Sequence, residues 1–443
     1  MKHPRRLLAS IPSFFAIPAR PKRSPVWIAL LAASSLLAPA LSSSAKATLE
    51  TSPKALVDEV WQIINREFIS YDFNQEEWLA TRTELLKQDY TSQEEAYSAI
   101  RKALKDLGDP YTRFLNPQEF EELSNQTTGE LSGIGLRLEV NSQTQVLTVV
   151  EPLDNSPASE AGLQTGDKIL KIDSKPTTLM TVEQASELIR GEEGTEVTLE
   201  VSRGIETPFE VTLKRAQVEV PVLHSSLKQE GQMRIGYLRL DEFSSHAAEQ
   251  MKKAVEKLEA DKVEGFVLDL RGNPGGLLFA SVDIARMWIE NGPIVRTVDR
   301  KGGDREFSAN RTSITNLPLV VLVDGYSASA SEILAGALKD NKRATIVGTR
   351  TFGKGLVQSV HPLSDGSGLA VTISRYYPPS GIDINKKGIL PDIQLDSREE
   401  IPTALKGTGR DEQYARAVSV LSNIRLGQNR AATSGGLATT QQQ

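Results

Sequence analysis

Short apolar segments alternate with amphipathic helical segments between Ile235 and Val347, and this alternation constrains the fold more than any other feature. Gly265–Leu270 is a continuous apolar run that ends in a glycine-rich loop, and helical spacing follows from Leu277. Leu319–Val323 is a second run of the same kind. Apolar runs of this length are typical of strands buried on both faces. The pattern therefore predicts an α/β layer built of strand–helix–strand crossover units.

The chain of 443 residues is too long for one ordinary core, and its remaining parts differ in character. Apolar residues recur at three- and four-residue spacing from Leu56 to about Leu123, which predicts a helical region with a packing role only. Short β-rich segments begin near Gly129 and predict an α+β domain. Thr207–Val222 is expected to form extended linker strands. The expected fold is multidomain α/β, with a helical region (48–128), an α+β domain (129–206), an α/β core with linker strands (207–430) and a disordered tail (431–443).

The first 47 residues have the features of an export signal. They contain seven basic residues and no acidic one, followed by an apolar run from Val26 to Leu41 and the small-residue sequence Ala45-Lys46-Ala47. A basic segment, a short apolar segment and small residues are typical of a secretory signal. If the segment were kept as an anchor, it would hold the protein at a membrane surface. Its removal would change the formal net charge from −6 to −13, because seven positive charges are lost.

Composition excludes several kinds of chemistry. The chain has no cysteine, which removes thiol nucleophiles and cysteine-bound metals. It has four histidines and no HExxH motif, so no metal or other cofactor is expected and a Ser-His-Asp site is disfavoured. An exported acidic protein is also a poor candidate for binding nucleic acid.

A serine and a lysine in the stretch Asp324–Gln358 are the candidate catalytic residues. Ser329 lies in a turn of small residues just before a helical segment, and Lys354 lies between two glycines in apolar surroundings. A serine needs a base to take its proton, and burial lowers the pKa of a lysine so that it can serve as that base. Ser327 and Ser331 are nearly equal candidates on local chemistry alone.

Backbone amides near these residues could stabilise an oxyanion. The amide of Ala330 lies at a helix N-terminus, where amides are free and carry partial positive charge. A second donor is expected from the loop Gly272–Gly276, with Gly275 or Gly276 as the candidate, because glycine lets the backbone approach closely.

The phrase SPASEAGLQTGDKILKID, from Ser156 to Asp173, resembles a PDZ domain. The resemblance implies a groove for a peptide C-terminus. In it the loop Ser132, Gly133, Ile134, Gly135 and Leu136 would hold the carboxylate with its amides, and the strand that follows would pair with the peptide backbone.

The motifs occur in the order PDZ, DLRGNPGG, SASASEI, TFGKGLVQ and PPSGIDINKKGILPD, and this order resembles the C-terminal processing (tail-specific) peptidases. The resemblance runs from about Leu56 to Asp392. It implies a helical part, a PDZ domain and a crotonase/ClpP-like α/β core. It also implies that Ser329 is the nucleophile, Lys354 the base and Gln358 the residue that orients the base, with Glu332 as a secondary acidic support.

Further motifs, among them Gly108-Asp109-Pro110-Tyr111-Thr112-Arg113-Phe114-Leu115 and Ala285-Arg286-Met287-Trp288, resemble the branch of this family found in oxygenic phototrophs. That branch trims the photosystem II D1 precursor, which implies a thylakoid lumen or periplasm and a protein substrate with a free, apolar C-terminus. The alternatives are a general tail-specific protease of the cell envelope, a non-catalytic PDZ scaffold and a crotonase-type acyl-CoA enzyme. Intact Ser329, Lys354 and Gln358 disfavour the scaffold, and the PDZ module and export signal disfavour the acyl-CoA enzyme.

Overall fold

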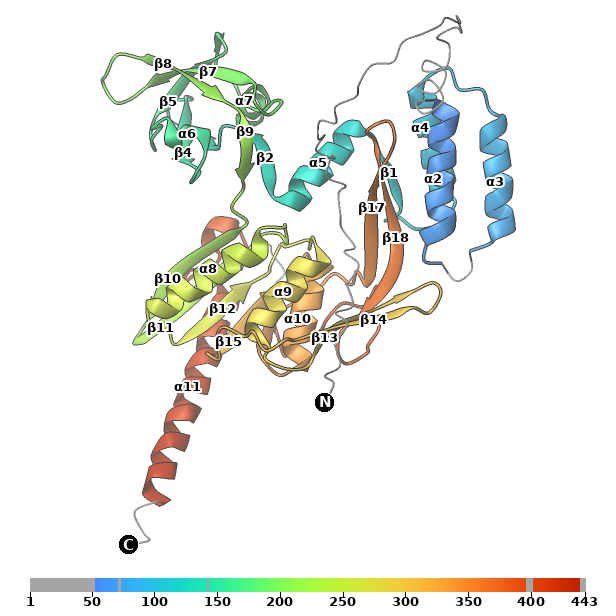
Figure 1. The fold of residues 1–443 in the computed structure, drawn as a ribbon. Helices are drawn as coiled ribbons and strands as arrows, with labels where there is room; N and C mark the ends of the chain where they lie inside the picture. Colours follow the sequence, from blue (N-terminus) through green and yellow to red (C-terminus); the bar gives the residue numbers. More distant parts are fainter. Residues whose placement is uncertain (1–51, 71–72, 142, 396–400, 439–443) are drawn as a thin grey trace, which may run out of the picture. The chain divides into compact units, whose positions relative to one another are not determined.

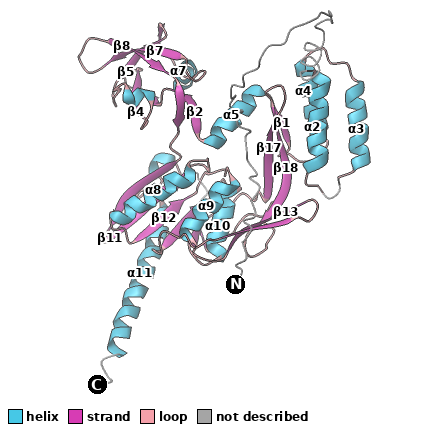
Figure 2. Cartoon of the chain, in the orientation of Figure 1, coloured by secondary structure: helices cyan, strands magenta, loops and turns pink. Residues whose placement is uncertain are grey.

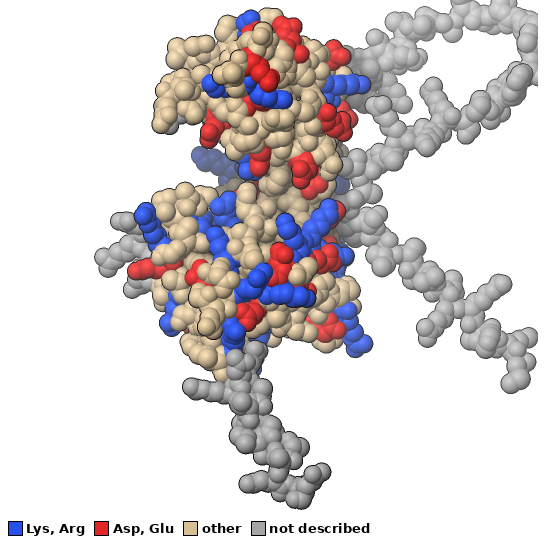
Figure 3. Space-filling view, turned by 90° about the vertical axis from the view of Figure 1, so that its left-hand side faces the viewer, with Lys and Arg blue, Asp and Glu red and all other residues tan. Residues whose placement is uncertain are grey.

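A computed structural model of the protein describes residues 52–70, 73–141, 143–395 and 401–438 (Figure 1). The export signal predicted for residues 1–47 lies outside these ranges. Within them, no helix combines the length and the apolar character that a membrane span requires. On the face drawn in Figure 3, lysine and arginine side chains are interspersed with aspartate and glutamate.

The predicted α/β layer is a six-stranded sheet in the order β10-β11-β12-β15-β16-β19. Strands β11, β12, β15, β16 and β19 run parallel, and β10 pairs antiparallel with β11. Helices cover both faces of the sheet (Figure 2). Its strands are β10 (Leu223–Glu230), β11 (Met233–Leu240), β12 (Gly265–Asp269), β15 (Leu319–Val323), β16 (Thr345–Gly348) and β19 (Ile393–Gln394), and its helices are α8 (Ala247–Ala260), α9 (Leu278–Trp288), α10 (Ala330–Asp340) and α11 (Glu412–Ala438).

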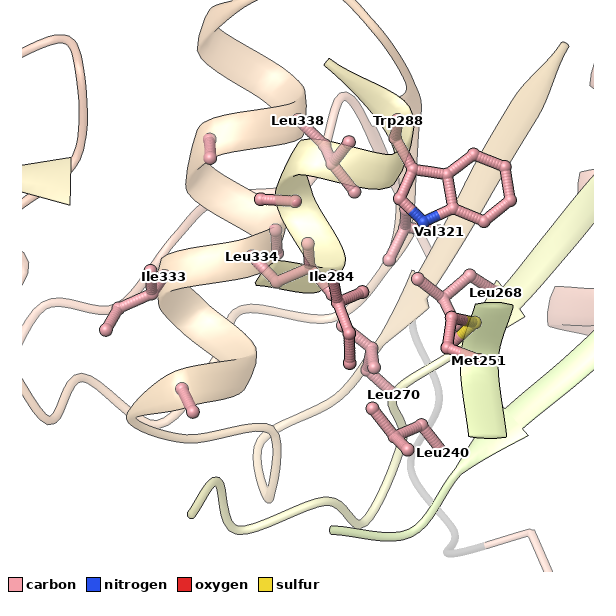
Figure 4. Close-up of a cluster of buried hydrophobic side chains, with 14 of the residues drawn as sticks. Leu240, Met251, Leu268, Leu270, Ile284, Trp288, Val321, Ile333, Leu334 and Leu338 are labelled. Atoms are coloured by element: carbon pink, nitrogen blue, oxygen red, sulfur yellow. The ribbon is translucent and has the colours of Figure 1, made fainter. Parts of the chain in front are cut away.

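Alternating side chains of the parallel strands build two cores, one on each face. Leu268 and Val321 point to the face covered by α8, α9 and α10, where they pack with Trp288 (Figure 4). The neighbouring Val267 and Val320 point to the other face and pack against α11. All five residues of β12 and all five of β15 are buried, which explains why these strands are continuous apolar runs.

The helical region shares a sheet and a core with the C-terminal part of the chain. Strand β1 pairs antiparallel with β18, which also pairs with β13 and β17. Leu369 and Val371 of β18 belong to the same hydrophobic cluster as α2 and α4. The elements are α2 (Pro53–Glu67), α3 (Gln75–Lys87), α4 (Gln93–Lys105), β1 (Arg113–Leu115), α5 (Pro117–Thr128), β13 (Pro293–Asp299), β14 (Asp304–Ser308), β17 (Leu356–Pro362) and β18 (Gly368–Tyr377).

The predicted α+β domain has its own sheet, in the order β3-β4-β5-β7-β8, and its own hydrophobic core. Helix α7 packs beside β3, the strand at one edge of this sheet. A separate two-stranded ladder joins β2 and β9. The elements are β2 (Glu130–Gly133), β3 (Leu136–Val140), β4 (Leu147–Pro152), α6 (Pro157–Glu160), β5 (Lys168–Ile172), β6 (Lys175–Pro176), α7 (Val182–Ile189), β7 (Glu196–Ser202), β8 (Phe209–Lys214) and β9 (Ala216–Glu219).

The structure differs from three of the sequence predictions. Strand β8 pairs with β7, so this domain extends beyond 206 to Lys214, because β8 completes its sheet and the expected linker strands are not all linkers. The helical region is not a separate packing unit, because β1 belongs to the sheet of β18. Helix α11 continues to Ala438, so residues 431–438 are helical where their composition predicts disorder; helix propagation costs less than nucleation once the preceding turns are packed.

Candidate active site

Ser329 lies at a strained turn between strand β15 and helix α10. Its backbone has φ 54° and ψ −114°, outside the regions open to most residues with a Cβ atom. The Tyr376 hydroxyl donates to the Ser329 carbonyl at 3.0 Å, and the Ser329 amide donates to Glu332 Oε2 at 3.0 Å. A sharp strand-to-helix turn of this kind presents a nucleophile at the end of a sheet.

The surroundings of the three candidate serines differ. The Ser327 hydroxyl is buried and donates to the Leu270 carbonyl at 2.8 Å. The Ser331 hydroxyl is buried and donates to the Asn273 carbonyl at 3.0 Å. Ser329 is the partly exposed member of the set. Geometry therefore favours Ser329 as the reactive hydroxyl, a choice that local sequence left open.

Lys354 lies in the loop between β16 and β17 and is half-buried. Burial lowers the pKa of its ammonium, and the nearby Arg113 acts in the same direction, while Asp109 and Glu332 oppose them. Its Nζ lies 4.8 Å from the centre of the Tyr111 ring. The apolar, glycine-flanked sequence predicted partial burial for this lysine, and a lowered pKa favours the neutral amine that a base requires.

The buried carboxylate of Glu332 joins the serine turn to the lysine loop. Its Oε2 accepts the amides of Ser329 (3.0 Å) and Lys354 (2.8 Å). Its Oε1 accepts the Thr351 hydroxyl (2.6 Å) and the Gly353 amide (2.7 Å). The two amide nitrogens that share Oε2 cannot be further apart than the sum of their two distances to it. The structure therefore brings Ser329 and Lys354 together through one side chain.

Replacing Glu332 with glutamine should weaken both the fold and the activity. All four partners of Glu332 donate, and an amide would turn an NH2 group toward two of them, which leaves buried donors unpaired. We expect a loss of about 2 kcal/mol in the free energy of unfolding, measured in urea, and a fall of about 10²-fold in kcat because the Ser329 turn and the Lys354 loop would shift relative to each other. Glu290→Gln, at an exposed glutamate, is the matched control. Activity equal to that of the parent protein would contradict this role.

Asn273 fixes the glycine-rich loop against the serine turn. Its side-chain nitrogen donates to the Leu240 carbonyl at 2.8 Å. Its backbone carbonyl accepts the Ala328 amide at 3.1 Å and the Ser331 hydroxyl at 3.0 Å. Its side-chain oxygen accepts the Gly275 amide at 2.8 Å. The loop and the turn therefore form one hydrogen-bonded unit.

The two glycines proposed as oxyanion donors differ. Gly275 has φ +110°, and a Cβ on it would lie 2.8 Å from Ser329 Cβ and 3.0 Å from the Ala330 amide nitrogen, so only glycine fits. Its amide, however, donates to Asn273, because the tight loop turns that amide back on the side chain two residues earlier. In this conformation Gly275 is a spacer and not a free donor, which corrects the expectation for that residue. The amides of Gly276 and Ala330 remain the candidates.

A buried ion cluster anchors the same loop. The Arg271 guanidinium donates to Asp269 at 2.8 Å and to Asp411 at 2.6 Å. Burial alone would lower the pKa of Arg271, but its bonds to the two carboxylates raise it. The Tyr237 hydroxyl also donates to Asp269, at 2.7 Å. Asp411, which precedes α11, was not predicted, because nothing in the local sequence relates it to a loop 140 residues earlier.

Gln358 lies in β17, where the pairing with β18 shifts register between Val357 and Gln358. Its Nε2 donates to the Thr372 hydroxyl of β18 at 3.3 Å, and Thr372 in turn donates to Asp109 at 2.6 Å. Sequence reasoning missed Asp109, Tyr111 and Thr372. The stretch Gly108–Arg113 contains the first two, but the sequence identified it only as a family motif and assigned its residues no place at the site.

The residues predicted to bind a substrate carboxylate do not form one loop. Ser132 and Gly133 belong to β2, which pairs with β9, and the Ser132 hydroxyl donates to the Gly191 carbonyl at 2.6 Å. Ile134 is fully buried, and Gly135 has φ +74°, where a Cβ would collide with Ser156. Leu136 begins the edge strand β3. The turn is therefore shorter than expected, because cross-strand pairing with β9 extends β2 to Gly133.

The chain is similar to known proteases over most of its length. Residues 234–395 match peptidase family S41, and residues 148–203 match a PDZ domain. The carboxyl-terminal-processing protease of a Synechocystis strain is 42% identical over 385 residues, covering 86% of this chain and 90% of that protein. The chloroplastic C-terminal processing peptidase of Tetradesmus obliquus is 39% identical over 375 residues, 81% of each chain.

A solved structure of a photosystem II D1 C-terminal processing protease has a TM-score of 0.53 and 37% identity, and covers 83% of this chain and 100% of that one. Such likenesses define a serine-type peptidase with a PDZ domain. The chain belongs to peptidase family S41, among the carboxyl-terminal-processing proteases. The family, the fold class and the class of enzyme predicted from the motifs are thereby confirmed.

Proposed function

We propose that the protein cuts its substrate with a Ser329–Lys354 dyad. The observation that carries this proposal is the shared carboxylate of Glu332, which accepts the amides of both residues. Ser329 Oγ attacks the scissile carbonyl carbon while the neutral Lys354 amine takes the hydroxyl proton. The amide of Ala330, with that of Gly276, stabilises the oxyanion. The C–N bond then breaks, and Lys354 returns its proton to the leaving amine.

Water completes the reaction from the side of the departed amine. Lys354, neutral again, takes a proton from the water as the water attacks the carbonyl carbon of the acyl-enzyme ester. The ester bond then breaks, and Lys354 returns the proton to Ser329 Oγ. Gln358 orients the lysine through this cycle. No proton has to leave the site for bulk solvent, so one lysine serves both half-reactions.

The PDZ domain selects substrates by their free C-terminus. Strand β3 lies at the edge of its sheet and α7 packs beside it, so an extended peptide can add to this edge as a further strand. The turn at Ile134 and Gly135 precedes β3, where backbone amides can take the terminal carboxylate. The substrate we propose therefore ends in an extended, apolar segment.

The proposed substrate is the precursor of the photosystem II D1 protein, and the proposed compartment is the thylakoid lumen or the periplasm. Support comes from the similarity to the solved photosystem II D1 C-terminal processing protease, and from relatives in a cyanobacterium and in chloroplasts. The alternative is a general tail-specific protease of the cell envelope.

A competition between peptides tests the proposed substrate. The mature protein is incubated with a D1 C-terminal precursor peptide, with the same peptide amidated at its C-terminus, and with unrelated peptides that end in apolar residues. We expect one cut in the D1 peptide by mass spectrometry, and a fall of about tenfold in kcat/KM on amidation, because a charge-assisted hydrogen bond to the carboxylate is lost. Equal rates on all apolar-tailed peptides would favour the general protease, and equal rates with the amide would contradict recognition of the C-terminus.

A further inference from the structure

The turn that precedes β1 lies next to the candidate base. Strand β1 pairs with β18 (Arg113↔Ala370), which draws the residues before it onto the sheet that carries Gln358. The Tyr111 ring faces Lys354 Nζ at 4.8 Å, within the range of a cation–π contact. A region predicted only to pack thus supplies an aromatic face to the lysine.

A chain of hydrogen bonds with a fixed direction links the same turn to Gln358 through Thr372. A threonine hydroxyl has one proton to donate, and a carboxylate can only accept. Thr372 therefore gives its proton to Asp109 Oδ2, at 2.6 Å, and must accept from Gln358. This turns Gln358 Nε2 toward Thr372, at 3.3 Å, and places the carbonyl oxygen Oε1 at the other end of the amide. Without Asp109 the hydroxyl could donate in either direction, and both orientations of the Gln358 amide would be allowed.

We propose that Asp109 and Tyr111 are positioning residues for the lysine base, Asp109 through Thr372 and Gln358, and Tyr111 by direct contact of its ring with the lysine ammonium. The proposal rests on the role of Lys354 proposed above. An oriented Gln358 presents an acceptor, and not a donor, for the ammonium that forms when Lys354 takes the serine proton. The Tyr111 ring stabilises the same charged species with the negative face of its π-system.

Asp109 also has a structural role that the test must separate. It accepts the amides of Tyr111 (3.2 Å) and Thr112 (3.1 Å) and the Thr112 hydroxyl (2.7 Å), and so holds the turn together. Thr372 is fully buried, and its amide donates to the Thr112 hydroxyl at 3.1 Å. A loss of activity alone would therefore not distinguish positioning from folding.

A double-mutant cycle makes that distinction. Thr372→Val keeps the shape of the side chain and removes the hydroxyl. On a peptide that the parent protein cleaves, we expect kcat/KM to fall about tenfold in the parent background, and less than about twofold in a Gln358→Ala background. Thr372→Ser should restore most of the lost rate. Val371→Ala, a buried packing change on the same strand, controls for lost stability. It should lower kcat/KM by the same factor in the parent and in the Gln358→Ala background.

A pH profile and a substitution of the Tyr111 ring test the positioning role without depending on whether the Thr372→Val variant folds. The charged and titratable groups that face Lys354 are Asp109, Tyr111, Arg113 and Glu332. Asp109→Asn removes a negative charge that favours the ammonium, so the acidic limb of kcat/KM should move to lower pH. Tyr111→Leu should lower kcat about three- to tenfold, and Tyr111→Phe, which keeps the ring, should not.

The outcomes separate this proposal from the dyad itself. If Lys354→Ala still cleaved peptides, the dyad would be wrong. If Lys354→Ala were inactive, but the Thr372→Val and Gln358→Ala effects multiplied and Asp109→Asn left the pH limb in place, only the positioning role would be overturned.

Discussion

Replacing Ser329 with alanine should abolish cleavage of every peptide substrate, by about 10⁴-fold or more in kcat, while the protein stays folded. The hydroxyl of this partly exposed serine is the nucleophile of the proposed mechanism, and removing it leaves only binding and the oxyanion donors. Its backbone amide and carbonyl, which bond to Glu332 and Tyr376, are retained by alanine. The free energy of unfolding should therefore change by less than about 1 kcal/mol, as measured in urea.

The neighbouring serines provide the matched controls. Ser327→Ala and Ser331→Ala each remove a buried hydroxyl that donates to a backbone carbonyl, so we expect a loss of about 1 kcal/mol of stability but continued cleavage. Ser329→Gly should be inactive yet more stable than Ser329→Ala, because glycine adopts φ 54° without strain. An active Ser329→Ala variant, or an inactive and folded Ser331→Ala variant, would mean that the nucleophile is wrongly assigned.

Replacing Lys354 with arginine should be almost as damaging as removing Ser329. Arginine keeps the positive charge but does not deprotonate in proteins, so it cannot take the serine proton. Burial lowers the pKa of Lys354 from its ordinary value of 10.5. Since the base must be neutral, kcat/KM of the parent protein should fall as the pH falls through this lowered pKa, and the limb should lie below pH 10.5.

Lys387→Arg, at an exposed lysine, is the control for the charge and size of arginine and should cleave normally. Circular dichroism and urea unfolding establish whether Lys354→Arg is folded. Cleavage by a folded Lys354→Arg protein, or a pH limb at or above the ordinary lysine value, would refute the lysine base.

The local elements of the core were predictable because each depends on residues close in sequence. The runs Gly265–Leu270 and Leu319–Val323 are buried strands, as their apolar character indicated. The small-residue turn before α10 and the glycine-flanked lysine also lie where the pattern placed them. Hydrophobic periodicity and turn chemistry are short-range properties, so they survive folding unchanged.

Availability of individual groups was not predictable, because it depends on partners far along the chain. On local chemistry Ser327 and Ser331 are equivalent to Ser329, but in the structure their hydroxyls donate to the carbonyls of Leu270 and Asn273, more than fifty residues earlier. The sequence predicted a free amide at Gly275, but in the folded loop this amide donates to the side chain of Asn273.

By itself, the sequence determined the order of the domains, the kind of enzyme and a short stretch that contains the proposed nucleophile and the proposed base. Only the tertiary structure decided which of the three serines is partly exposed, and that Glu332 accepts the backbone amides of both Ser329 and Lys354. It also brought Asp109 to Thr372, 263 residues away in the chain. The physical reason is that a hydrogen bond needs its two atoms within about 3 Å, and pairing of β1 with β18 meets that condition only after the chain has folded.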